Sequence, residues 1–187
     1  MLAKNYNMPI KNIWKAGIGM QRAKSQEHLK NMLLTALFAA MIYVVTAFVK
    51  IPTHQGYIHV GDGIIYIAAA LLPTPYAMAA GAIGGGLSDY LSGYAIWVLP
   101  TIIIKAMQAS LFTSKKNNIV NKRNIIAVIF SAVVCIVGYY LAGGVLYGNF
   151  GAALADVPTN LIQSVASAAL FIFLGIVLDR MDFKKHI

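Results

Sequence analysis

Long apolar segments with almost no charge are the feature that most limits what this chain can fold into. Of its 187 residues, 59% are hydrophobic and 11% are charged, whereas an ordinary soluble domain carries about 25% charged residues. A helix needs about 20 mostly apolar residues to cross the hydrocarbon core of a membrane. Backbone groups in lipid must be hydrogen-bonded within their own segment, which favours helices. The sequence therefore predicts an all-α integral membrane protein.

Six apolar segments divide the chain between prolines, glycines and charged residues. The predicted transmembrane helices cover approximately residues 29–48, 60–72, 76–91, 96–112, 125–146 and 158–178. The second is shorter than a full crossing requires, so the predicted topology depends on it. The predicted domains are a polar, basic leader (1–28), the six-helix transmembrane domain (29–180) and a short tail (181–187).

Basic residues fall almost entirely on one side of this topology. Thirteen lysines and arginines precede the first segment, separate the fourth from the fifth or follow the sixth, and the opposite side has only Lys50. Because cytoplasmic loops are rich in Lys and Arg, we expect both termini in the cytoplasm of a bacterial cell and a multi-pass protein in its plasma membrane. Topology and attraction to anionic lipid headgroups account for the net charge of +9, so no nucleic acid partner is predicted.

Other classes of function find little support in the residues. The chain has one cysteine, Cys135, which excludes an intramolecular disulfide and a CxxC metal site. His54, His59 and Asp62 could be metal ligands, but their spacing fits no strong pattern. HExxH and GxSxG sequences and close carboxylate pairs within a span are absent from the sequence. We therefore predict no enzymatic activity, no metal and no cofactor.

Two charged residues, Asp89 and Lys105, interrupt the apolar segments. Each would cost about 2.5–3.5 kcal/mol at the centre of a bilayer, so each should face the protein interior and have a partner. The third and fourth helices are joined by a short loop and must be antiparallel neighbours. The sequence therefore predicts an Asp89–Lys105 ion pair, which either only stabilises the bundle or also borders a polar ligand.

Small residues recur at helical spacing in two segments. Ala36 and Ala40 lie one turn apart in the first, and the third has Ala, Gly or Asp at every fourth position from 77 to 93. Small residues let helices approach closely. The run Gly84-Gly85-Gly86 lacks a following Gly-Lys-Ser/Thr, so it predicts helix packing and no phosphate loop. For Ala36 and Ala40, packing within the chain and packing against another protein both stay open.

Polar and aromatic residues gather near the expected outer ends of the helices. The candidate site residues are His59, Asp62, Asp89, Tyr94, Trp97, Lys105, Tyr139, Asn160 and Gln163. An aromatic wall with a few oriented polar groups is the usual composition of a small-molecule site. The aromatic residues equally suit an interfacial belt. Asn160 and Gln163 share a helix face, where they could instead hydrogen-bond a neighbouring helix.

Four features together resemble the substrate-binding S components of energy-coupling factor (ECF) vitamin transporters, in the riboflavin-type branch with its proposed hydroxymethylpyrimidine and pyridoxine carriers. They are the Ala36–Ala40 pair, His59-Val60-Gly61-Asp62-Gly63, the segment from Gly81 through Asp89 to Tyr94, and Ile104-Lys105. The resemblance covers residues from about 29 to 180. It implies a non-catalytic subunit that captures a vitamin outside the cell with high affinity.

The resemblance also implies partners and a substrate class. Ala36 and Ala40 would dock on a transmembrane coupling (T) subunit that is driven by two ABC-type ATPases. Nickel and cobalt carriers of the wider group have a histidine as second residue, where this chain has Leu2, so metal is not the expected cargo. Hydroxymethylpyrimidine or pyridoxine is expected, with riboflavin next. The alternatives are a stand-alone ion- or proton-coupled transporter that uses Asp89 and Lys105 and, behind it, an intramembrane enzyme.

Overall fold

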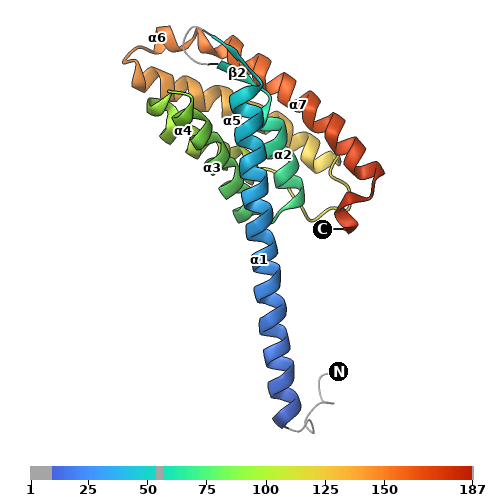
Figure 1. The fold of residues 1–187 in the computed structure, drawn as a ribbon. Coiled ribbons are helices and arrows are strands. Elements are labelled where there is room, and N and C mark those ends of the chain that lie inside the picture. The colour runs from blue at the N-terminus through green and yellow to red at the C-terminus, as the bar shows by residue number, and fades with distance from the viewer. Residues whose placement is uncertain (1–9, 54–56, 187) are drawn as a thin grey trace.

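The computed structural model describes residues 10–53 and 57–186, with side chains from residue 19 onward. In this part of the chain, six helices of 11 residues or more form a bundle (Figure 1). They are α1 (Ile10–Phe48), α2 (Gly61–Leu71), α3 (Thr74–Leu91), α4 (Val98–Ser110), α5 (Lys122–Leu146) and α7 (Asp156–Arg180). The short elements are β1 (Lys50–Pro52), β2 (Tyr57–His59), η1 (Ala95–Trp97), α6 (Phe150–Ala153) and η2 (Phe183–Lys185).

The lengths and outer surfaces of the helices are those of an all-α membrane protein. Three described segments are long and apolar enough to cross a membrane: Gly19–Phe48, Lys122–Leu146 and Phe150–Arg180. Large apolar side chains cover their outer faces; Phe130 on α5 and Phe173 on α7 are 59% and 65% exposed. α2 and α4 are apolar but shorter, and the 11 residues of α2 rise only about 16 Å.

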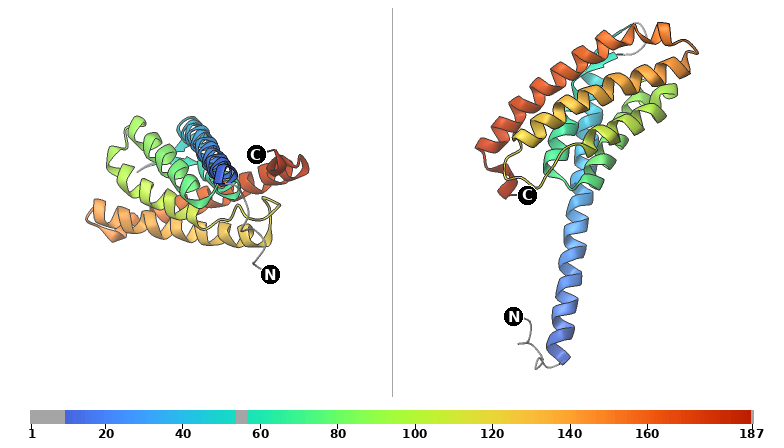
Figure 2. Two further views of the ribbon diagram at one scale, coloured as in Figure 1. Left: turned by 90° about the horizontal axis from the view of Figure 1, so that it is seen from below. Right: turned by 180° about the vertical axis from the view of Figure 1, so that it is seen from behind.

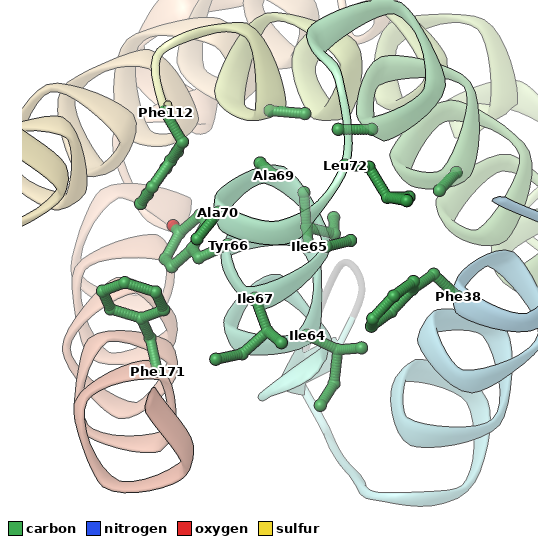
Figure 3. Packing of buried hydrophobic residues seen from close by; sticks show 14 of the residues in the cluster. Phe38, Ile64, Ile65, Tyr66, Ile67, Ala69, Ala70, Leu72, Phe112 and Phe171 are labelled. Atoms are coloured by element: carbon green, nitrogen blue, oxygen red, sulfur yellow. The ribbon is translucent and has the colours of Figure 1, made fainter. Parts of the chain in front are cut away.

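α2 lies at the centre of the bundle, which explains how so short a helix is accommodated. Its residues from Gly61 to Ala70 are all buried, and it contacts α1, α3, α4 and α7. Figure 3 shows apolar side chains of α2 between Phe38 of α1 on one side and Phe112 and Phe171 on the other. The Tyr66 and Phe112 rings stack with centroids 4.8 Å apart. Because protein surrounds α2, neighbouring helices rather than lipid meet its polar groups.

The glycines of α3 allow close packing on two sides, as the sequence predicted. A Cβ on Gly84 would lie 2.7 Å from the carbonyl oxygen of Ala39 in α1. A Cβ on Gly85 would lie 3.0 Å from Cγ of Lys105 in α4. A side chain at either position would hold α3 away from a neighbouring helix, so the run acts through its lack of side chains.

α1 differs most from the prediction. It begins at Ile10, far before residue 29, and its first half projects beyond the other helices (Figure 2). Within the bundle, Ala39 and Ile42 are buried against α3, whereas Ala36 and Ala40 are exposed. The small-residue pair therefore does not pack within the chain.

The connections gather at two opposite ends of the bundle. One end, here called the hairpin end, carries the antiparallel pair β1–β2, in which Ile51 faces Ile58, with η1 and α6. The sequence analysis did not predict this hairpin. The other end, called the stalk end, has a groove that brings together Lys30 of α1, residues 114–118 and residues 182–185. The three basic regions of the sequence thus meet at the same end.

Candidate ligand-binding site

A cavity of about 70 Å³ lies at the hairpin end. The residues that line it come from the hairpin, from the end of α3, from η1, and from α4, α5 and α7. They are Thr53, Tyr57, His59, Asp89, Tyr94, Trp97, Thr101, Tyr139, Asp156, Thr159, Asn160 and Gln163. The hairpin, the connection between α3 and α4, and the neighbouring helices therefore surround one pocket.

Seven of the nine site residues predicted from the sequence line this pocket. They are His59, Asp89, Tyr94, Trp97, Tyr139, Asn160 and Gln163. The other two, Asp62 and Lys105, lie deeper between the helices and do not line it.

Asp62 and Lys105 form a buried ion pair between α2 and α4. Lys105 Nζ lies 2.7 Å from Asp62 Oδ1 and donates a hydrogen bond to Oδ2 at 3.0 Å. The predicted Asp89–Lys105 pair is therefore wrong. The prediction followed the short loop between α3 and α4, but α2 also packs against α4 and places a carboxylate nearer to the ammonium group.

Further donors meet the same Asp62 carboxylate. Gln163 Nε2 of α7 lies 3.2 Å from Oδ2, Gln108 Nε2 of α4 lies 3.4 Å away, and Cys135 Sγ of α5 lies 3.9 Å away. We call these five residues the Asp62 cluster. It joins four helices in the bundle interior, where an uncompensated charge would be most costly. Gln163 belongs to the cluster and to the pocket, so it links the two.

The Asp89 side chain is hydrogen-bonded to Tyr57 of the hairpin. The Tyr57 hydroxyl donates to Asp89 Oδ1 at 2.6 Å and lies 3.2 Å from Ser88 Oγ. Burial, together with the neighbouring Asp89 carboxylate, raises the pKa of Tyr57. The phenol therefore stays protonated and donates, and its bond fixes the hairpin over the end of α3.

His59 is the pocket residue nearest to the start of α2. Burial lowers the pKa of His59 to about 4, because the imidazolium would lose its hydration. Its ring is thus neutral at neutral pH, and Nδ1 accepts a hydrogen bond from the Gly61 backbone N–H at 3.1 Å. This bond satisfies the backbone N–H of the first residue of α2.

Aromatic rings form much of the wall. Trp97 packs on Tyr139 with centroids 5.8 Å apart, and Tyr57 packs on Tyr94 at 5.1 Å. The Tyr139 hydroxyl also lies 2.9 Å from Thr101 Oγ1. The pocket therefore offers flat apolar surfaces together with hydroxyl, amide and carboxylate groups, which suits a polar aromatic ring.

Sequence reasoning missed five lining residues: Thr53, Tyr57, Thr101, Asp156 and Thr159. Asp156 and Thr159 precede Asn160 and Gln163 at helical spacing, so extending that helix face would have found them. Tyr57 had no such signal, because only the hairpin carries it to Asp89. His54, considered above as a metal ligand, lies outside the described residues.

A helical membrane bundle with a polar aromatic pocket at one end is suited to binding a small molecule, and comparisons with known proteins agree. A solved structure described as "Structure and mechanism of the S component of a bacterial ECF transporter" superimposes with a TM-score of 0.66 at 18% identity. The superposition covers 82% of this chain and 98% of the solved chain. The two proteins therefore share a fold. The family model for the ECF-type riboflavin transporter S component matches residues 26–180, and the chain belongs to that family.

Two relatives are similar over most of their lengths. An uncharacterized protein in a gap 3' region of Pyrococcus woesei is 29% identical over 133 residues, which are 71% of this chain and 88% of the relative. The thiamine precursor transporter HmpT of Lactococcus lactis subsp. cremoris (strain MG1363) is 24% identical over 157 residues. These residues are 82% of this chain and 90% of the relative. As an S component, the chain is a vitamin-binding, non-catalytic subunit of a cell-membrane transporter that has T and ATPase subunits.

Proposed function

We propose that this S component captures hydroxymethylpyrimidine or pyridoxine outside the cell, with riboflavin as the next candidate. The cavity, at about 70 Å³, carries the proposal. One heterocyclic ring suits a space of this size better than the three fused rings and ribityl chain of riboflavin do. The relative named as a thiamine precursor transporter supports a pyrimidine.

Recognition would combine stacking with a few directed hydrogen bonds. Trp97 and Tyr139 both line the cavity and would pack against a flat ligand. The Asp89 carboxylate can accept from an exocyclic amino or hydroxyl group, and Asn160 and Gln163 can bond ring nitrogens or hydroxyl groups. Asp62 and Lys105, both included in the predicted binding set, would act through Gln163 rather than by touching the ligand.

The hairpin end would face the outside, with six crossings and both termini in the cytoplasm. The gathering of lysines at the stalk end supports this orientation, since basic residues are retained on the cytoplasmic side. The pocket would then open toward external vitamin, with the β1–β2 hairpin over it.

The exposed pair Ala36 and Ala40 would form the docking face for the T subunit, which two ATPases energise. Leu33 and Leu37 on the same helix are 64% and 55% exposed. An apolar surface that contains small residues allows close approach of another helix within the membrane. A stand-alone proton-coupled carrier loses support, because the Asp89–Lys105 pair on which it depended is not formed.

Native mass spectrometry of the detergent-purified protein tests the substrate. Hydroxymethylpyrimidine, pyridoxine and riboflavin would be added separately to protein freed of endogenous ligand. We expect one of the single-ring compounds to bind at micromolar concentration or below. Failure of all three to bind a folded protein would overturn the proposal, and tight binding of riboflavin alone would overturn the preference for one ring.

The docking face is tested by the double substitution Ala36→Trp and Ala40→Trp. Bulky rings on this face should abolish assembly with the T subunit and ATPases but leave vitamin binding intact. Ala23→Trp is the matched control, because Ala23 is another exposed alanine of α1 and lies more than three turns before Ala36. Assembly that survives the double change would show that docking uses another surface.

A further inference from the structure

The charged side chains that line the pocket are acidic. Two carboxylates, Asp89 and Asp156, border the cavity, and no lysine or arginine among the described residues does so. His59 is buried and neutral at neutral pH. The other polar side-chain groups of the lining are hydroxyls, amides and the indole N–H of Trp97, which carry no charge.

The nearest cations are engaged elsewhere. Lys105 is fully buried, and its charge is balanced by Asp62 at 2.7 Å. Lys50 donates to Ser92 Oγ at 2.7 Å and lies over the Tyr57 ring at 4.8 Å. Neither side chain lines the cavity, so an anionic ligand would meet carboxylates without a partner of opposite charge.

We infer that the pocket admits neutral or cationic heterocycles and rejects the phosphate esters of the same compounds. The inference rests on the proposed function, because it concerns the charge of the ligand that this site takes. A phosphate monoester carries close to two negative charges near pH 7. Proteins that bind phosphate supply arginines, lysines or arrays of backbone N–H groups, and this lining supplies two carboxylates instead.

The expected selectivity is large enough to measure. Repulsion between like charges a few ångströms apart at a partly solvated site lowers affinity by about tenfold or more. A vitamin phosphorylated after uptake would therefore no longer fit the pocket. The pocket would bind the external, unphosphorylated form and not the internal, phosphorylated one.

Binding of matched ligand pairs to the full-length protein in detergent tests the inference. Hydroxymethylpyrimidine would be compared with its monophosphate, and pyridoxine with pyridoxine 5'-phosphate, by calorimetry at pH 7.5. We expect the ester to bind at least about tenfold more weakly than its parent. An ester that binds as tightly as its parent would overturn the inference and leave the proposed function standing. Failure of every parent and ester to bind would overturn both.

Three substitutions separate charge from size. Asp156 is only partly buried near the start of α7, so Asp156→Asn should fold and should reduce the penalty on the ester by about threefold. Glu27→Gln, on the exposed face of α1, removes the same charge far from the pocket and should leave the penalty unchanged. An unchanged penalty in both Asp156→Asn and Asp89→Asn would show that size alone excludes the ester, and the inference from charge would be wrong.

Discussion

The Asp62 cluster and the pocket around Asp89 are neighbouring polar regions with different surroundings. Asp62 is completely buried, and its carboxylate meets an ammonium, two amides and a thiol from the protein itself. Asp89 accepts from Tyr57 and borders an open cavity. A charge whose partners are all supplied by the fold holds helices together, whereas a charge beside a cavity is available to a ligand. The predictions below test this division.

The largest effect is expected when the Asp62 cluster loses its cation. Lys105→Met leaves a buried carboxylate without a countercharge and should lower the free energy of unfolding by about 3–5 kcal/mol. Adding Asp62→Asn should recover most of the loss, because the buried charge is then gone. Unfolding in detergent, followed by intrinsic fluorescence, measures both. Lys115→Met, at an exposed position, is the control and should change stability by less than about 0.5 kcal/mol. A double variant as unstable as the single one would show that the pair does not act as a unit.

A substitution of Asp89 in the pocket should affect ligand binding more than it affects stability. Asp89→Asn removes a charged acceptor and should weaken vitamin binding by about tenfold to a hundredfold, while the free energy of unfolding changes by less than about 1 kcal/mol. Calorimetric titration and unfolding on the same preparation give both values. Asp182→Asn, in the exposed tail, should alter neither. A large loss of stability with unchanged affinity would reverse the roles given to the two regions.

His59 borders the pocket beside the start of α2, and its effect should depend on pH. Its pKa is about 4 in the folded protein, below the ordinary 6.5. The unfolded chain therefore binds more protons between these values, so stability is lost as pH falls from 6.5 toward 4. The contribution of His59 amounts to about 2 kcal/mol between pH 8 and pH 5.

His59→Gln should flatten this part of the stability profile, whereas His186→Gln, at an exposed position, should not. Unfolding measured at a series of pH values provides the test. An equally steep profile in His59→Gln would mean that the ring is not held neutral by burial.

The smallest effect is expected at the hydroxyl that joins the hairpin to α3. Tyr57→Phe removes the 2.6 Å bond to Asp89 but keeps the ring. Vitamin affinity should fall by about threefold to tenfold, the value of one ordinary hydrogen bond. Tyr90→Phe, on the exposed surface of α3, is the control. Unchanged affinity would place the hairpin bond outside the binding machinery.

Much of the architecture followed from the sequence, because it depends on local patterns. Apolar length located the six main helices to within a few residues inside the bundle, and the glycine run of α3 predicted close packing that the structure confirms. The ion pair could not be predicted in the same way. Asp62 and Lys105 lie 43 residues apart, and neither residue carries a local sign that α2, rather than α3, supplies the partner carboxylate.

For the candidate site too, the sequence predicted some residues and missed others. His59, Tyr94 and Asn160 were found because they lie in loops or helix ends that the topology sends to one side. Tyr57 was missed because its place depends on how the β1–β2 hairpin folds over α3. Hairpin geometry is set by contacts between strands and with the bundle, which no pattern within residues 51–59 displays.

The sequence by itself determined that the chain is an all-α membrane protein with six main helices, with its basic residues on one side and a set of polar aromatic residues on the other. Hydropathy and charge act residue by residue, so they can be read along the chain. The tertiary structure alone decided that α2 is the central helix, that Lys105 pairs with Asp62, and that Asp89 is left at the pocket. These outcomes depend on which helices touch, and helix contacts are set by packing among side chains that are distant in sequence.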